Sequence, residues 1–192
     1  MSPSESQEPV PVVDKERREP ADRLIDFVTS LVKREDRGSL AALRKSLGHD
    51  FPPAEAMRLL VPLIPPEFNE WKKRCSFQVA ALYAFHQEHT EEGNMGDTYR
   101  GLGDHESAQK RFIRLLDSMT GNLFPALKQA VGLARAKNVA VNYRQLLKDL
   151  FNWDHPKRFV QEQWAFSRWK DTVNEEEVSK DTAASSADSK EE

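Results

Sequence analysis

Apolar residues recur every three or four positions through the middle of this chain, and that spacing predicts α-helices. Pro20 suits the first turn of the first helix, whose apolar stripe follows it: Leu24, Ile25, Val28, Leu31 and Val32. The same period predicts further helices at about 39–47, 53–61, 67–86, 105–119, 123–138, 142–151 and 156–169. No stretch alternates as a half-buried strand does. The pattern therefore predicts an all-α protein of about eight helices.

Turn-forming residues mark the expected helix ends. Gly38 is predicted to end the first helix, and Ser39 to cap the second. Residues 120–122 are predicted to turn the chain, and Asn142 to cap the helix that follows it. The segment 88–104 has four glycines and no apolar period, so it is predicted to be a loop.

This loop divides the predicted helices into two small packed bundles. The N-terminal bundle is expected over 20–97 and the C-terminal, basic bundle over 98–172. The ends, 1–19 and 173–192, are acidic, contain few large apolar residues and cannot bury enough surface to offset the entropy of ordering. We therefore predict two disordered acidic tails.

The composition narrows the function classes. No run approaches the roughly 18 apolar residues of a membrane-spanning helix, and the N-terminal residues do not resemble a signal peptide. The single cysteine, Cys75, excludes an intrachain disulfide and lies on a predicted core stripe. These features favour a cytoplasmic protein with no membrane contact.

Enzyme signatures are scarce. The chain has no P-loop, no nucleophile elbow and no complete dinucleotide fingerprint, since Gly101 and Gly103 lack the third glycine and the preceding strand. His86, His89 and His105 could meet at a metal ion, but no suitably spaced acids complete the set, so we expect ordinary surface histidines. The sequence therefore predicts no catalytic residue, cofactor or metal.

Charge is unevenly distributed along the chain. The net charge is −3, yet residues 100–170 hold thirteen basic and six acidic side chains, while 21–99 hold ten and twelve. The basic residues of the second half are predicted to lie opposite the apolar stripes: Lys110, Arg111, Arg114, Lys128, Arg135, Lys137, Arg144 and Lys148. Arg37, Arg44 and Lys45 form a smaller cluster in the first half. Basic side chains spaced three or four residues apart on a helix repel one another. This arrangement suggests that an external anion, such as nucleic acid, binds them.

Four segments resemble, in order, the CasB family, the small subunit of the type I-E CRISPR complex Cascade. The first is Arg37-Gly-x-Leu-Ala-x-Leu-Arg-Lys45, and Trp71 then begins the long helix after a proline-bounded stretch. The Gly101-Leu-Gly103 segment precedes Arg111-Phe112, and the last segment carries a Leu-rich helix, a Trp, a basic turn and a terminal Trp-Ala helix. The resemblance covers about 35–170 and leaves out both tails.

The resemblance implies a fold of two helical bundles without catalytic activity. It implies these partners: other Cascade subunits, a second copy of this chain, guide RNA, and the target and displaced DNA strands. The resemblance implies contacts to the nucleic-acid backbone. These contacts come from basic side chains that match the family pattern: Arg44, Lys45, Arg111, Arg114, Arg144, Lys148 and Arg158. In antiviral defence such contacts would stabilise the opened strand.

Two other functions fit parts of the sequence. A helical adaptor that binds only proteins would explain apolar residues left outside the stripes, such as Phe51, Phe77 and Phe166. A metal-dependent nuclease would use the three histidines. Measuring DNA binding at several salt concentrations tests the adaptor, which would not bind DNA even at low ionic strength. Incubating nucleic acid with the protein and divalent metals tests the nuclease.

Overall fold

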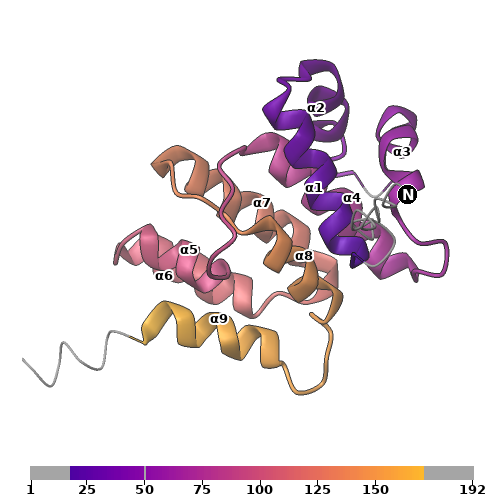
Figure 1. Cartoon of the computed structure of the whole chain (residues 1–192). Helices are drawn as coiled ribbons and strands as arrows, with labels where there is room; N and C mark the ends of the chain where they lie inside the picture. The colour runs from indigo at the N-terminus through magenta and orange to yellow at the C-terminus, as the bar shows by residue number, and fades with distance from the viewer. Residues whose placement is uncertain (1–17, 50, 171–192) are drawn as a thin grey trace, which may run out of the picture.

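The protein is described by a computed structural model that covers residues 18–49 and 51–170 (Figure 1). These residues form α-helices and one 3₁₀ turn, and their only β contact is a single bridge between His89 and Val141. The predicted all-α class is confirmed. The elements are α1 (Pro20–Lys33), α2 (Arg37–Arg44), α3 (Ala54–Leu60), η1 (Val61–Leu63), α4 (Glu70–Phe85), α5 (Met95–Gly101), α6 (Glu106–Leu116), α7 (Thr120–Lys137), α8 (Tyr143–Phe151) and α9 (Phe159–Trp169).

Helix α2 starts earlier than predicted, because Asp36 and not Ser39 is its N-cap. The Asp36 carboxylate accepts a hydrogen bond from the Ser39 backbone N–H at 3.0 Å and from the Ser39 hydroxyl at 2.8 Å. Gly38 therefore lies inside α2 instead of ending α1. The same bonds lower the pKa of Asp36, since they stabilise its ionised form.

The segment predicted to be a loop, 88–104, contains helix α5. Its first turn is closed by a capping box, in which Asn94 accepts from the N–H groups of Gly96 and Asp97 while Asp97 accepts from the Asn94 N–H. The helix has only seven residues, too few for an apolar period to be recognised. The sequence feature that could have predicted α5 is the Asn94-x-x-Asp97 spacing of its capping box.

Two more helix boundaries differ from the prediction. Residues 120–122 form the first turn of α7 instead of a separate turn, and Asn138 ends α7 in the left-handed conformation, as expected for its predicted stop. Pro156 lies in the turn before α9, which begins at Phe159. Asn142 caps α8 as predicted, because its side chain accepts from the Gln145 N–H at 2.9 Å.

Helix α8 joins the two halves of the sequence, because it packs against both α1 and α4 (Figure 1). Tyr143 stacks on Tyr83 of α4 with ring centroids 4.5 Å apart, and Trp71 of α4 donates to the carbonyl of Leu150 at 2.8 Å. The buried residues of both halves form one continuous hydrophobic cluster. The predicted boundary at residues 97–98 lies inside α5, and the division into two bundles remains a prediction.

The other helices pack mainly in pairs, and α2 packs on both α4 and α3. Helix α5 crosses α9 at Gly96, and α6 packs on α7. Trp153 and Trp164 are buried with ring centroids 5.0 Å apart, and Trp169 packs against the edge of the core. Met119, which the predicted helix over 105–119 included, lies beyond the end of α6 and is 81% exposed. Phe77, expected to lie outside the apolar stripes, is in the core.

The predicted tails fall almost entirely outside the described residues, which omit 1–17, 50 and 171–192. The two described residues of the N-terminal tail make contacts: Arg18 pairs with Asp26 at 2.9 Å and Glu19 with Lys148 at 2.8 Å. None of the described helices has the length and apolar character needed to cross a membrane.

Candidate nucleic-acid interface

The predicted basic residues separate into two groups according to their partners. Five of them are exposed and make no ion pair within the described residues: Arg44, Arg111, Arg114, Lys128 and Lys137. The others contact acids, carbonyls or rings of the same chain. A cation without an internal partner keeps its full capacity to neutralise a phosphate, so the first group defines the candidate interface.

One member of that group, Lys128 of α7, lies close to the end of α2, the helix that carries Arg44. Gln78 of α4 holds the turn after α2 by donating to the carbonyls of Ser46 and His49, both at 3.1 Å. Lys128 of α7 lies over this turn, since a Cβ built on Gly48 would be 3.9 Å from its Nζ. We call the basic residues at the end of α2 and along α7, namely Arg44, Lys45, Lys128, Arg135 and Lys137, the α2–α7 face.

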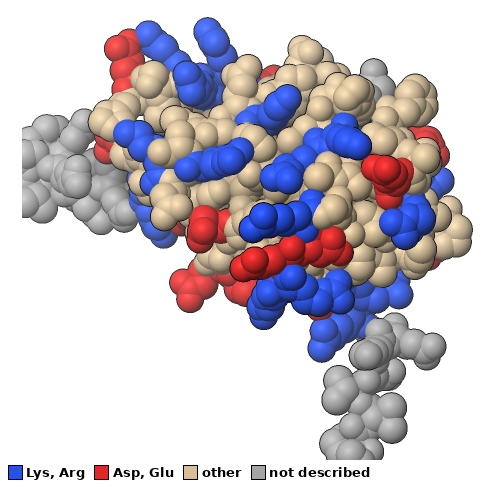
Figure 2. Space-filling view, turned by 90° about the horizontal axis from the view of Figure 1, so that it is seen from above, with Lys and Arg blue, Asp and Glu red and all other residues tan. Residues whose placement is uncertain are grey.

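Two members of this face also contact the protein itself. Lys45 lies 3.5 Å from Glu55 with both side chains 65% exposed, and such a pair contributes little to stability. Arg135 lies over the Phe85 ring, 4.6 Å from its centroid, which positions the guanidinium but leaves its hydrogen-bonding edge available. Figure 2, seen from the side on which α2 lies, shows Lys and Arg side chains spread over this surface, with acidic side chains in a few places among them.

The second set lies on α6. Lys110 pairs with Glu106 one turn earlier, whereas Arg111 and Arg114 project from the exposed side of a helix that buries Phe112 and Leu115. The spacing predicted this division between basic and apolar sides. We call Lys110, Arg111 and Arg114 the α6 edge.

Arg37 was left out of the predicted site, although it was noticed in the first-half cluster. It is exposed, makes no ion pair within the described part of the chain, and lies seven residues before Arg44 on α2. Two helical turns place both residues on one side of the helix. The seven-residue spacing was the signal that could have included it.

Arg144 and Lys148 have internal partners, in contrast to the expectation that they face an external anion. Arg144 donates to Asp22 and Asp26 of α1 at 3.2 and 2.7 Å and to Glu91 at 2.8 Å, and its side chain is only 21% exposed. Lys148 lies 2.8 Å from Glu19 and 3.2 Å from Asp22. These acids offset the repulsion between the two bases, so we leave both outside the proposed interface.

The contact between Arg144 and Glu91 shifts the pKa values of both residues. Hydrogen bonds from Arg144 lower the pKa of Glu91 to about 2, and the acids around Arg144 raise the pKa of its guanidinium. The contribution of Glu91 to stability is therefore present above its ordinary pKa of 4.5 and is lost as the pH falls through about 2. Glu91 and Arg144 therefore stay charged throughout the physiological range.

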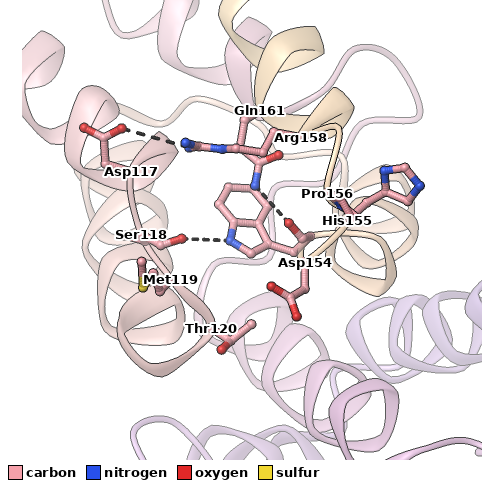
Figure 3. A pocket seen from close by; sticks show the side chains of 10 residues that line it. Asp117, Ser118, Met119, Thr120, Asp154, His155, Pro156, Arg158 and Gln161 are labelled. Carbon is pink, nitrogen blue, oxygen red and sulfur yellow. Dashed lines mark hydrogen bonds and ion pairs between the residues drawn. The ribbon is translucent and has the colours of Figure 1, made fainter.

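Arg158 lies at a hollow of about 290 Å³ between the α6–α7 turn and the segment before α9 (Figure 3). It donates to the Leu116 carbonyl at 2.7 Å and lies 4.0 Å from Asp117. In the same wall, Trp153 donates to the Ser118 carbonyl at 2.9 Å. These bonds hold the α6–α7 turn against α9, which gives Arg158 a structural role, and we leave it outside the interface.

The three histidines weighed as metal ligands do not come together at a ligand cluster. His86 is buried instead of exposed, and its Nε2 lies 2.8 Å from the Val139 carbonyl. His89 lies 3.1 Å from the Val141 carbonyl and 3.1 Å from Glu91. His105 is the N-cap residue of α6. The described ranges contain no group of three or more His, Cys, Asp or Glu side chains that could hold a metal ion.

Cys75 lies in the core, as predicted. Burial raises the pKa of its thiol, which keeps the sulfur protonated and unreactive at neutral pH.

Comparison with known proteins gives consistent results. The model of the family described as CRISPR-associated protein Cse2 matches residues 39–169. A CRISPR-associated protein Cse2 from Thermus thermophilus is 29% identical over 176 residues, which make up 86% of this chain and 99% of that relative.

Solved structures agree with the fold. The crystal structure of CasB from Thermus thermophilus superposes with a TM-score of 0.70 at 28% identity, covering 80% of this chain and 99% of that one. A chain from a CRISPR RNA-guided surveillance complex superposes with a TM-score of 0.68 at 23% identity, covering 82% and 96%, which supports the fold alone.

Proposed function

This chain belongs to the Cse2 family, and from this premise we propose that it is a non-catalytic subunit of an RNA-guided CRISPR surveillance complex. The CasB structure from Thermus thermophilus shares its fold. The role of this chain in the complex is to hold nucleic acid by the backbone through the α2–α7 face and the α6 edge. The complex is of the type I-E Cascade kind and works in the cytoplasm. The partners are the other Cascade subunits, a second copy of this chain, guide RNA, and the target and displaced DNA strands.

The observation that carries the proposal is the set of exposed Lys and Arg side chains that make no ion pair within the described residues. Arg44, Arg111, Arg114, Lys128 and Lys137 project from helices whose opposite sides are fixed in the core. Cations on a rigid support neutralise phosphates and release counterions without ordering a loop. An anion from outside the molecule can therefore bind this set without displacing an internal partner among the described residues.

Such a surface holds nucleic acid without reading its sequence. Contacts to phosphates position a strand, whereas sequence is read at the base edges. In an RNA-guided complex the guide pairs with the target strand, so specificity comes from base pairing. A subunit that stabilises the opened state needs only electrostatic contact with the displaced and target backbones.

The test is the double substitution Arg111→Gln and Arg114→Gln. Each lost phosphate contact lowers the slope of log affinity against log salt by about 0.7 on single-stranded DNA, so two should lower it by about 1.4. The matched control is Arg58→Gln with Lys157→Gln, which removes the same charge from exposed bases outside both sets. We expect the control to keep nearly the wild-type slope.

The outcomes separate this proposal from the protein-only adaptor. Loss of slope in the α6 variant but not in the control, with an unchanged melting temperature, supports the proposal. An unchanged slope moves the contact to the α2–α7 face, which Arg44→Gln with Lys128→Gln tests in turn. If all these variants and the wild type bind equally weakly at low salt, alone and within the assembled complex, the adaptor is the correct function.

A further inference from the structure

An acidic segment follows α9 directly in the sequence. Residues 175–192 contain seven acidic and two basic side chains. The Cse2 family model ends at residue 169, and the Thermus CasB structure is covered to 99% by only 80% of this chain. The acidic segment therefore lies outside the part of this chain that the family model matches.

The end of α9 lies against α6. The rings of Trp169 and Phe112 meet edge to face, with centroids 5.3 Å apart. Phe112 is fully buried, while Arg111 beside it in the sequence is exposed. The chain thus leaves the described structure at Lys170 beside the helix that carries the α6 edge.

The α6 edge and the segment are complementary in charge. Arg111 and Arg114 make no ion pair among the described residues, and Glu106, the acid within that helix, is already paired with Lys110. A segment attached beside this edge meets it at an effective concentration in the millimolar range, far above that of an unattached ligand. The 22 residues after Lys170 can extend at most about 70 Å, which amply spans an eleven-residue helix of about 16 Å.

We propose that residues 175–192 act as a built-in competitor that occupies the α6 edge until nucleic acid displaces them. The inference rests on the proposed function, because it assigns a regulator to the same basic surface. The segment weakens binding to short or isolated strands, which compete with it poorly. A long backbone that also engages the α2–α7 face displaces it, so binding is biased toward extended, opened strands.

The direct test neutralises the segment without shortening the chain. One full-length variant carries Glu175→Gln, Glu176→Gln, Glu177→Gln and Asp181→Asn. The matched control carries Glu5→Gln, Glu8→Gln, Asp14→Asn and Glu16→Gln, which removes the same charge from the other end. The readout is the Kd for a mixed-sequence single-stranded DNA of about 30 nucleotides, long enough to span several phosphate contacts, at about 50 and about 300 mM salt.

We expect the C-terminal variant to bind about fivefold more tightly than the wild type at the lower salt concentration, because several exposed ion pairs no longer compete. The N-terminal control should change less than about twofold, and at the higher salt concentration the gain should largely disappear through screening. In the Arg111→Gln and Arg114→Gln background the gain should vanish at both salt concentrations. Equal gains in both tail variants would show a general charge effect and overturn the inference.

A second measurement does not depend on nucleic acid. A carbodiimide joins an amine to a carboxylate only when they touch, so the DNA-free Glu106→Gln variant, in which Lys110 has lost its partner on α6, should give a link from Lys110 to an acid of 175–192, as mapped by mass spectrometry. Excess single-stranded DNA should suppress that link. If the DNA-free variant gives no such link, the competitor is absent. If the link forms but no variant binds DNA, the proposed function fails while the contact stands.

Discussion

Asp149 is a carboxyl group placed in the hydrophobic core, with 5% of its surface exposed. Its two oxygens accept hydrogen bonds from the Trp164 indole at 2.6 Å and from the Gln145 amide at 2.7 Å. Burial raises its pKa to about 6, because removal from water disfavours the ionised form more than the two neutral donors stabilise it. The residue thus joins α8 to α9 and makes the stability of the fold depend on pH.

The sign of that dependence follows from linkage. The folded protein binds the Asp149 proton more tightly than the unfolded chain, so this contribution to stability is complete below pH 3.8 and is lost as the pH rises through about 6. From about pH 4 to about pH 7 the loss is on the order of 2–3 kcal/mol. Urea unfolding of wild type and Asp149→Asn at both pH values measures it, since the variant lacks the titration. A constant difference between the two proteins would show that Asp149 keeps an ordinary pKa.

At the scale of helices, the sequence predicted elements with strong apolar stripes and misplaced those defined by local side-chain bonds. The stripes of α1, α4, α6 and α8 were long enough to be recognised. Helix α5 and the start of α2 depend instead on Asn94, Asp97 and Asp36, whose capping bonds leave no periodic signal. The closeness of α5 to α9 was also beyond prediction, because it depends on a residue with no side chain.

Gly96 sets the distance at which α5 crosses α9. A Cβ built there would lie 2.0 Å from the Trp164 carbonyl oxygen, inside any permitted contact. We expect Gly96→Ala to destabilise the protein by about 3 kcal/mol, since two backbones must separate. Thermal and urea unfolding measure the effect.

Gly132 provides the matched control. It lies within α7, and a Cβ there would meet nothing within 4 Å. Gly132→Ala should therefore stabilise the protein by up to about 1 kcal/mol through helix propensity alone. Equal effects of the two substitutions would contradict the close crossing.

Across the whole molecule, the basic residues of the second half fall into two groups, exposed residues and residues paired with acids of the same chain. The surplus of basic residues in the second half predicted a polyanion-binding surface, and the exposed bases of α6 and α7 agree with that pattern. Arg144 and Lys148, chosen by the same reasoning, bind acids of α1 more than a hundred residues away. Spacing within one helix cannot distinguish these cases, because it contains no information about which distant acid packs opposite.

Arg144 should therefore matter for stability more than for binding. We expect Arg144→Gln to lower the unfolding free energy by about 2 kcal/mol, because Asp22, Asp26 and Glu91 lose a partly buried partner. Lys110→Gln, which breaks an exposed pair, should cost less than about 1 kcal/mol. Unfolding measured at low and high salt tests both, and equal losses would show that the Arg144 network behaves as an ordinary surface pair.

The position of α8 between α1 and α4 also has a consequence for synthesis of the chain. Arg144 and its partner Asp22 are 122 residues apart, and α8 ends 50 residues after α5. A ribosome adds on the order of 5–20 residues per second, so about 3–10 seconds separate the emergence of α5 from that of α8. During that interval the nascent chain presents Asp22 and Asp26 of α1 without their partner Arg144, together with an uncovered apolar side of α4. Helix α8 covers this surface when it packs against α1 and α4. A translation pause before α8 would therefore leave the surface exposed to chaperones and proteases.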